Sequence, residues 1–305
     1  MNIKHNKYIS MLLLFLAAFL WGFAFVAQDI VAVIPPITVG MVRWLIGTVF
    51  LVFVIIILDK VNNNGRKLIS KKGLDFTKSE VMGGLVTGVI VSVASVFQQM
   101  GISEGTSGGK AAFITALYVV LVPLYALILK KKVKLNVWIA IIIAVIGFYF
   151  LCIKEDFNMV KSDLWIIISA AIYPIQILAI DHYAPKCDCI RMSCLQFFFA
   201  FIVSALGVMI FESPVAWGEI STHIMPFLYL GICSSGIAYT LQVVGQRNVH
   251  PAVASLILSL ESVFGLLGAV VILGTELTVK EYIGAGMIFL AVLLSQIEFK
   301  KKNRV

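Results

Sequence analysis

Ten long apolar stretches are the feature that most restricts what this chain can fold into. A helix that crosses a bilayer needs about 20 mostly apolar residues, and runs of this length without strand-like alternation argue against a transmembrane β-barrel. The sequence therefore predicts an all-α integral membrane protein with ten transmembrane helices. The stretches cover approximately residues 8–31, 37–58, 80–101, 109–129, 134–153, 162–182, 190–211, 223–245, 250–273 and 279–298.

The scarcity of charged residues supports a lipid environment. Only 13% of the 305 residues are charged and 60% are apolar, whereas about a quarter of a soluble domain is charged. The net charge of +8 does not indicate nucleic-acid binding, because the basic residues lie in short connections and form no basic face.

The positions of lysine and arginine predict the orientation in the membrane. The connections on one side, with both chain ends, contain nineteen of the 24 basic residues, and the other side contains four, namely Lys110, Lys154, Lys161 and Lys280. The side richer in basic residues faces the cytoplasm. The prediction is N-in/C-in, with both termini cytoplasmic, and with 8–31 as a retained helix rather than a signal peptide.

An internal repeat divides the chain. Residues 81–129 align without a gap on 224–272 at an offset of 143, and the informative identities are Gly88/Gly231, Ser92/Ser235 and Gln99/Gln242. The repeat unit is then five helices, and because five is odd the second unit enters the membrane from the opposite side. We expect two inverted repeats with a substrate site between them, as in secondary transporters. The boundaries predicted are 1–153, an extracytoplasmic linker at 154–160, and 161–305.

Several motifs resemble one family of carriers. They are Trp21-Gly22-Phe23-Ala24-Phe25, Arg43-Trp44, the run from Thr115 to Pro123, Leu260-Glu261-Ser262-Val263-Phe264, and Leu273-Gly274-Thr275-Glu276. In order and on these helices, they resemble the drug/metabolite transporter superfamily, in its bacterial EamA-type branch. The chain departs from the family pattern at Ser262, where Pro is more frequent, and at Leu277. The resemblance implies a ten-helix carrier with a central cavity but no particular substrate, since the superfamily moves amino acids, amines, sugars, nucleosides and drugs.

Glu261 is the strongest candidate for a substrate-binding residue. It is the only charged residue between Arg247 and Glu276, and its distance from Pro251 places it near the membrane midplane. A charge there costs about 2.5–3.5 kcal/mol on insertion scales, so we expect the side chain to face the bundle interior. Two interpretations stay open: a proton-coupling group or counter-charge for a cationic substrate, and a structural partner of a helix end or of Arg43.

The remaining candidates are basic, aromatic and amide side chains. Arg43 could bind a substrate carboxylate, but outward snorkelling with packing is favoured. Aromatic rings at similar depths could form a cage for a quaternary ammonium or aromatic substrate or only pack in the bundle; they are Trp21, Trp44, Tyr118, Tyr173 and Tyr239. Trp21 and Tyr118 are preferred because they lie in the family motifs. Gln99 and Gln242 could donate hydrogen bonds into a cavity or cap it.

Other signals restrict the mechanism. Pro123 and Pro174 interrupt helical hydrogen bonding and are candidate hinges or static kinks. The segment 105–110 is not a phosphate-binding loop, because Glu104 and Ala111 replace the required Gly and Ser/Thr. No HExxH motif is present, and no metal or cofactor is predicted.

These inferences predict a secondary, non-ATP transporter, not an enzyme, in the plasma membrane of a prokaryote. The favoured function is export of an amino-acid-like or amine-like metabolite by alternating access. Metabolite uptake and multidrug-type efflux are the alternatives, and a membrane-embedded enzyme is a distant one. The expected partners are a small-molecule substrate and membrane lipid, with proton coupling through Glu261 as an option and without nucleic acid. The oligomeric state is not predicted.

Overall fold

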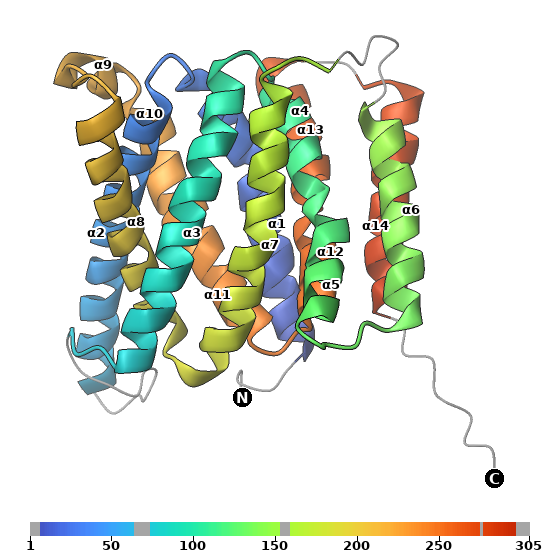
Figure 1. Ribbon diagram of the computed structural model, residues 1–305, viewed down its shortest axis with the longest axis horizontal. Helices are drawn as coiled ribbons and strands as arrows, with labels where there is room; N and C mark the ends of the chain where they lie inside the picture. The colour runs from blue at the N-terminus through green and yellow to red at the C-terminus, as the bar shows by residue number, and fades with distance from the viewer. Residues whose placement is uncertain (1–6, 64–73, 153–158, 275–276, 297–305) are drawn as a thin grey trace.

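The computed structural model describes residues 7–63, 74–152, 159–274 and 277–296, and within these ranges it contains helices and no strand. The long helices run roughly side by side (Figure 1). They are α1 (Lys7–Ile30), α2 (Pro36–Asn63), α3 (Lys78–Ser103), α4 (Gly108–Ala116), α5 (Tyr118–Ile128), α6 (Leu135–Cys152), α7 (Asp163–Tyr183), α8 (Cys189–Phe211), α10 (Ile224–Leu228), η3 (Tyr229–Tyr239), α11 (Thr240–Gln246), α12 (Pro251–Leu258), α13 (Glu261–Leu273) and α14 (Val279–Ser295).

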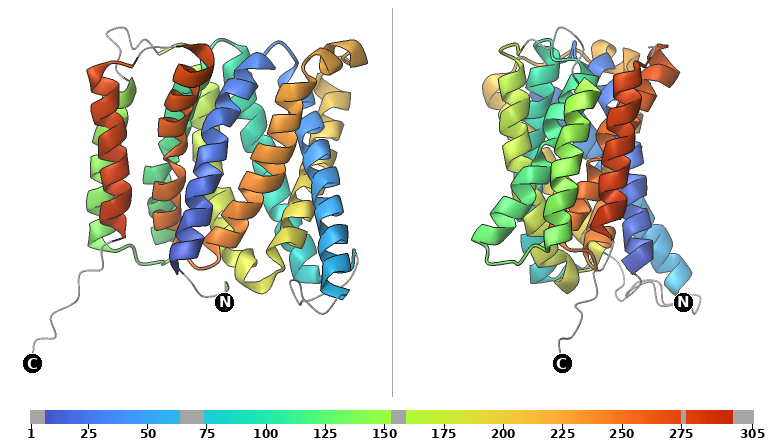
Figure 2. Two further views of the ribbon diagram at one scale, coloured as in Figure 1. Left: turned by 180° about the vertical axis from the view of Figure 1, so that it is seen from behind. Right: turned by 90° about the vertical axis from the view of Figure 1, so that its right-hand side faces the viewer.

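Every apolar stretch predicted from the sequence forms helix. In the described part of the chain, eight helical segments are long and apolar enough to cross a membrane. The two other predicted stretches form the shorter helices α6 and α14, which pack on each other at one edge of the bundle (Figure 2). Two short elements were not predicted: a 3-10 turn, η2 (Ala184–Lys186), and α9 (Trp217–Thr222) before α10.

The surface and interior have the polarity expected in lipid. Large apolar side chains point outward along the helices, including Ile142, Phe198, Phe289 and Leu290. Polar side chains are buried between the helices instead, and several of them are glutamines and serines. The first helix begins and the last described helix ends at the same end of the bundle (Figure 1).

Two helices are interrupted at equivalent positions. The predicted stretch 109–129 breaks at Leu117 between α4 and α5, and 250–273 breaks before Glu261 at the end of α12. Leu117 has φ −60° and ψ −14°, and Leu260, 143 residues later, has φ −59° and ψ −13°. In each case the Leu N–H donates to the carbonyl three residues earlier, at 3.2 Å. The first residues after the two tight turns are Tyr118 and Glu261.

A third stretch, 223–245, contains a π-helix. The segment η3 is π-helical over eleven residues. The π-helix is rare in proteins, and the examples that occur are often found at functional sites. Cβ atoms added at Gly231 and Gly236 would lie 2.4 Å from side-chain carbons of Ile46 and Phe50. The absence of side chains at these two glycines therefore lets α2 pack directly on the backbone of η3.

Candidate substrate-binding cavity

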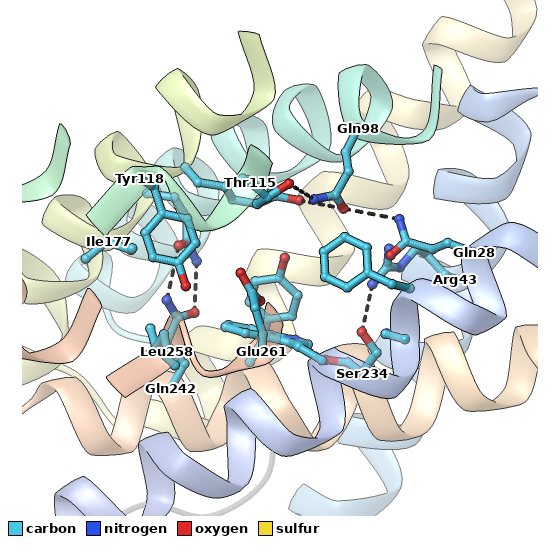
Figure 3. A pocket seen from close by; sticks show the side chains of 16 residues that line it. Gln28, Arg43, Gln98, Thr115, Tyr118, Ile177, Ser234, Gln242, Leu258 and Glu261 are labelled. Carbon is cyan, nitrogen blue, oxygen red and sulfur yellow. Dashed lines mark hydrogen bonds between the residues drawn. The ribbon is translucent and has the colours of Figure 1, made fainter. Parts of the chain in front are cut away.

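A cavity opens between the helices at the level of the two breaks (Figure 3). The space between its lining atoms is about 480 Å³, and this volume includes solvent space that is open to the outside. The lining comes from α1, α2, α3, α4, α5, α7, η3, α11, α12 and α13, and consists of Trp21, Ala24, Phe25, Gln28, Arg43, Gln98, Thr115, Tyr118, Tyr173, Gln176, Ile177, Ser234, Tyr239, Gln242, Leu258 and Glu261. Neither α6 nor α14 contributes to it.

The acidic part of the cavity is formed at the helix breaks. Glu261 is only 5% exposed, and its side chain points into the cavity (Figure 3). Glu261 Oε1 and the Tyr118 hydroxyl are both buried, and neither makes a well-formed hydrogen bond to a described residue. The two side chains are nevertheless close enough to interact with each other. Leaving a buried polar group without a partner costs about 1–3 kcal/mol, so these atoms are suited to receive a polar ligand.

The basic part of the cavity is formed by Arg43 on α2. The guanidinium donates to Ser234 Oγ at 3.0 Å and to Ser235 Oγ at 3.4 Å, both on η3. Arg43 is 4% exposed, which corrects the expectation of outward snorkelling: the side chain turns inward because the serines of η3 supply hydrogen-bond acceptors. No ion pair joins Arg43 to Glu261 within the described ranges.

Aromatic rings surround the space between these two charged groups. Trp21 donates from Nε1 to the Ser234 carbonyl at 3.1 Å, and its ring centroid is 4.6 Å from that of Tyr239. The Tyr173 hydroxyl donates to Gln98 Oε1 at 3.4 Å. Trp44 does not line the cavity; it lies behind Arg43, stacked on Phe197 at a centroid distance of 5.5 Å.

Two groups of buried glutamines complete the site. Gln28 Nε2 donates to Gln98 Oε1 at 3.1 Å and to Gln99 Oε1 at 3.3 Å, so Gln99 is a neighbour of the cavity rather than part of its lining. Gln176 and Gln242 donate to each other, both at 3.3 Å.

The structure thus brings seven of the nine candidate binding residues into one cavity and leaves Trp44 and Gln99 next to it. Sequence reasoning missed the lining residues Gln28, Gln98, Thr115, Gln176 and Ser234. The available signal was their polarity, because a polar side chain in an apolar helix needs a partner away from lipid.

The two candidate hinge prolines lie outside the cavity lining. Pro123 is inside α5 and Pro174 is inside α7, and both helices continue through them. The interruption of the 109–129 stretch lies at Leu117, before Pro123. A hinge function for either proline stays a prediction.

Comparisons with known proteins identify a transporter family over most of the chain. The model of the EamA-like transporter family matches residues 8–153 and again 160–296. An uncharacterized transporter of Archaeoglobus fulgidus is 30% identical over 283 residues, which cover 92% of this chain and 83% of that protein. A protein known from a crystal structure superimposes with a TM-score of 0.74 over 95% of this chain and 97% of its own, at 16% identity. This last likeness shows the fold alone.

Proposed function

The chain belongs to the EamA-like transporter family, and so to the drug/metabolite transporter superfamily, and from this premise we propose that it exports an amino-acid-like or amine-like metabolite by alternating access. It is then a secondary carrier, driven by a gradient. The observation that carries the proposal is the single cavity in which Glu261 and Arg43 are both buried without pairing with each other.

The substrate class follows from the cost of buried charge. An ionised group removed from water and left without an opposite charge is strongly unfavourable. A substrate ammonium would offset the charge of Glu261, with the Tyr118 hydroxyl as a neighbouring dipole, and a substrate carboxylate would offset the charge of Arg43. Trp21, Tyr173 and Tyr239 would contact the apolar part of the molecule.

Proton exchange at Glu261 fits the same site. When the ammonium leaves, a proton can neutralise the carboxyl, so the empty cavity need not contain an uncompensated negative charge. Substrate release would then be linked to proton uptake at Glu261. This would couple export to a proton gradient.

The alternating-access mechanism rests on a proposed architecture of ten crossings. In it α6 and α14 also span the plasma membrane of a prokaryote, both termini are cytoplasmic, and 1–153 and 161–305 are inverted repeats. The linker 154–160 falls mostly outside the described residues. Support comes from the helix breaks 143 residues apart, from the two separate matches of the family model and from the excess of basic residues on one side.

A counterflow experiment tests the proposed function. Proteoliposomes loaded with an unlabelled solute should accumulate the same solute in radiolabelled form, and the panel would contain amino acids, choline-like amines and nucleosides. We expect exchange of amino acids or amines. Arg43→Gln should reduce exchange of solutes with a carboxylate and spare simple amines. Absence of exchange for every solute, in protein that remains folded, would refute the carrier proposal. If exchange is observed, transport assays in oriented vesicles distinguish uptake from export.

A further inference from the structure

Two clusters of buried polar side chains, mostly glutamines, lie at opposite ends of the cavity. The first, here called the α1–α3 latch, consists of Gln28, Gln98, Gln99 and Thr115. The second, the α7–α11 latch, consists of Gln176 and Gln242. We propose that these latches are the two gates of the carrier, and that one opens while the other stays closed. This inference rests on the alternating-access mechanism proposed above.

The α1–α3 latch joins three helices. Gln28 of α1 donates to both glutamines of α3, and Gln99 Nε2 donates back to the Gln28 carbonyl at 3.2 Å. Gln98 Nε2 donates to Thr115 Oγ1 of α4 at 2.9 Å, and these side chains are no more than 5% exposed. Movement of α1 away from α3 and α4 therefore requires this cluster to separate.

The α7–α11 latch is a closed pair. Gln176 and Gln242 each donate one hydrogen bond to the other, and both are 1% exposed. Pro174 lies two residues before Gln176 in α7. Because proline supplies no backbone N–H and removes a helical hydrogen bond, α7 is locally easier to bend beside this latch.

The two latches close opposite ends of the same space. Gln28 and Gln99 lie near the last residues of α1 and α3, whereas Gln242 lies near the last residue of α11. These helix ends are at opposite ends of the bundle (Figure 1). Gln99 and Gln242 are also the pair that the offset of 143 equates, so the latches occupy equivalent positions in the proposed repeats. In the view of Figure 3, Glu261 lies between Gln242 and Gln28.

Neutral amides suit gates better than ion pairs. Separating a buried ion pair leaves two charges without compensation, whereas a separated amide pair can exchange its hydrogen bonds for bonds to water with a small net change in free energy. Each latch can therefore close the cavity and still open at modest cost. A bound substrate needs only a small differential interaction to shift the balance between the two states.

Hydrogen–deuterium exchange of the full-length protein in lipid nanodiscs, without substrate, tests this inference. Gln242→Leu keeps side-chain volume and removes the α7–α11 latch, so exchange should rise at the ends of α7 and α11 and fall at the end of α1. Gln99→Leu should produce the opposite pattern. We expect changes of roughly threefold to tenfold in exchange rate, the size of one or two lost hydrogen bonds. The matched control is Gln196→Leu, a buried glutamine of α8 that does not line the cavity.

Opposite patterns in the two variants, absent from the control, support the latches. Patterns in the same direction, or no difference from Gln196→Leu, would overturn them. If Gln99→Leu does not fold, Thr115→Val removes the bond from Gln98 with almost no change in shape and must give the same pattern. Since no solute is used, opposite shifts without any counterflow would refute the proposed function alone, and counterflow without opposite shifts would refute the latches alone.

Discussion

The carboxyl of Glu261 and the guanidinium of Arg43 are buried in one cavity, and each meets a different environment. The two serines of η3 accept hydrogen bonds from two nitrogens of the Arg43 guanidinium. Glu261 has one oxygen without a well-formed hydrogen bond to a described residue, and its side chain interacts with that of Tyr118. At the scale of single residues, the arginine is therefore already held in place, while the glutamate is the group that responds to what enters the cavity.

Replacement of Glu261 by Gln should lower amine or amino-acid counterflow about 10- to 100-fold, the cost of one charge-assisted hydrogen bond. In the unmodified protein, counterflow of a cationic solute should fall as the pH falls, because protonation removes the negative charge that binds it. Counterflow by the Glu261→Gln variant should depend little on pH, as measured in proteoliposomes buffered at a series of pH values. Glu219→Gln, on the exposed helix α9, is the matched control. Unchanged transport and an unchanged pH profile in Glu261→Gln would rule out the coupling role.

At this scale, the sequence pointed to the charged and motif aromatic side chains that line the cavity, but Gln242 was the one lining amide among its candidates. The function of these side chains in substrate binding stays a prediction. Glu261 was identifiable because one charge in a long apolar stretch must be compensated. Trp44 and Tyr239 could not be distinguished, since an aromatic ring packs equally well against protein or around a ligand. Gln28 and Gln176 were missed because an amide is identified by its partner, and both partners are more than 60 residues away in the sequence.

At the scale of helices, side chains from outside the helix hold the N-termini of α2 and α12 in place. The N-terminus of α2 is held by Glu212, whose carboxylate accepts from the Ile37 and Thr38 N–H groups at 2.7 and 2.8 Å. The N-terminus of α12 is held by His250, whose Nδ1 accepts from the Ala252 N–H at 3.3 Å. Such partners satisfy the N–H groups that the first helical turn leaves free.

The His250 cap should make the stability of the protein depend on pH. Partial burial lowers the pKa of His250 from its usual 6.5, as do Lys131 and Lys134, while Asp181 opposes them. The neutral ring therefore contributes stability above about pH 6.5 that is lost as the pH falls through the lowered pKa. His250→Asn keeps an acceptor that does not titrate, so its melting temperature in detergent should change less between pH 7.5 and 5.5 than that of the unmodified protein. A parallel change in both proteins would exclude His250 as the titrating cap.

The contact between α6 and α14 should depend on one glycine and not on its neighbour. A Cβ added at Gly284 would lie 2.5 Å from the Gly147 carbonyl oxygen, whereas one added at Gly286 would meet nothing within 4 Å. Gly284→Ala should destabilise the protein by about 1–3 kcal/mol, the cost of overpacking. Gly286→Ala is the control and should be close to neutral. Chemical unfolding in mixed micelles measures both, and equal effects would show that α6 and α14 are not packed as described.

The helix boundaries were largely predictable, because length and hydropathy determine them. The breaks at Leu117 and Leu260 and the π-helix of η3 were not. Neither leucine is a residue that disfavours helix, so these irregularities depend on packing between distant segments. The sequence repeat places the two breaks at equivalent positions, but neither segment has a helix-breaking residue at the break that would predict it.

At the scale of the whole molecule, the cavity lies within one group of helices and the α6–α14 pair stands outside it. Alternating access requires the cavity-forming helices to move relative to each other. Helices that contribute no lining can remain in place during that movement and provide a fixed border with the lipid.

The proposed orientation can be tested with reporter fusions. Green fluorescent protein placed after Val305 should fluoresce in cells, because a cytoplasmic C-terminus lets it fold. Alkaline phosphatase placed after Gly105, in the turn between α3 and α4, should be active, since that turn is predicted to be extracytoplasmic. Phosphatase fused after Lys132, between α5 and α6, is the control and should be inactive. The reverse pattern would invert the proposed topology.

The π-helix of η3 has a consequence for the direction of transport. The equivalent residues of the first proposed repeat, 86–96, lie in the regular helix α3. The two proposed repeats therefore differ in backbone structure at this position. A carrier with two identical halves would rest equally often in either orientation. In the proposed alternating-access mechanism, a segment present in only one repeat would favour one orientation of the empty protein, and would therefore affect which compartment meets the unoccupied site. Substitutions in η3 away from Ser234 and Ser235 would alter this preference while the groups that contact substrate stay unchanged.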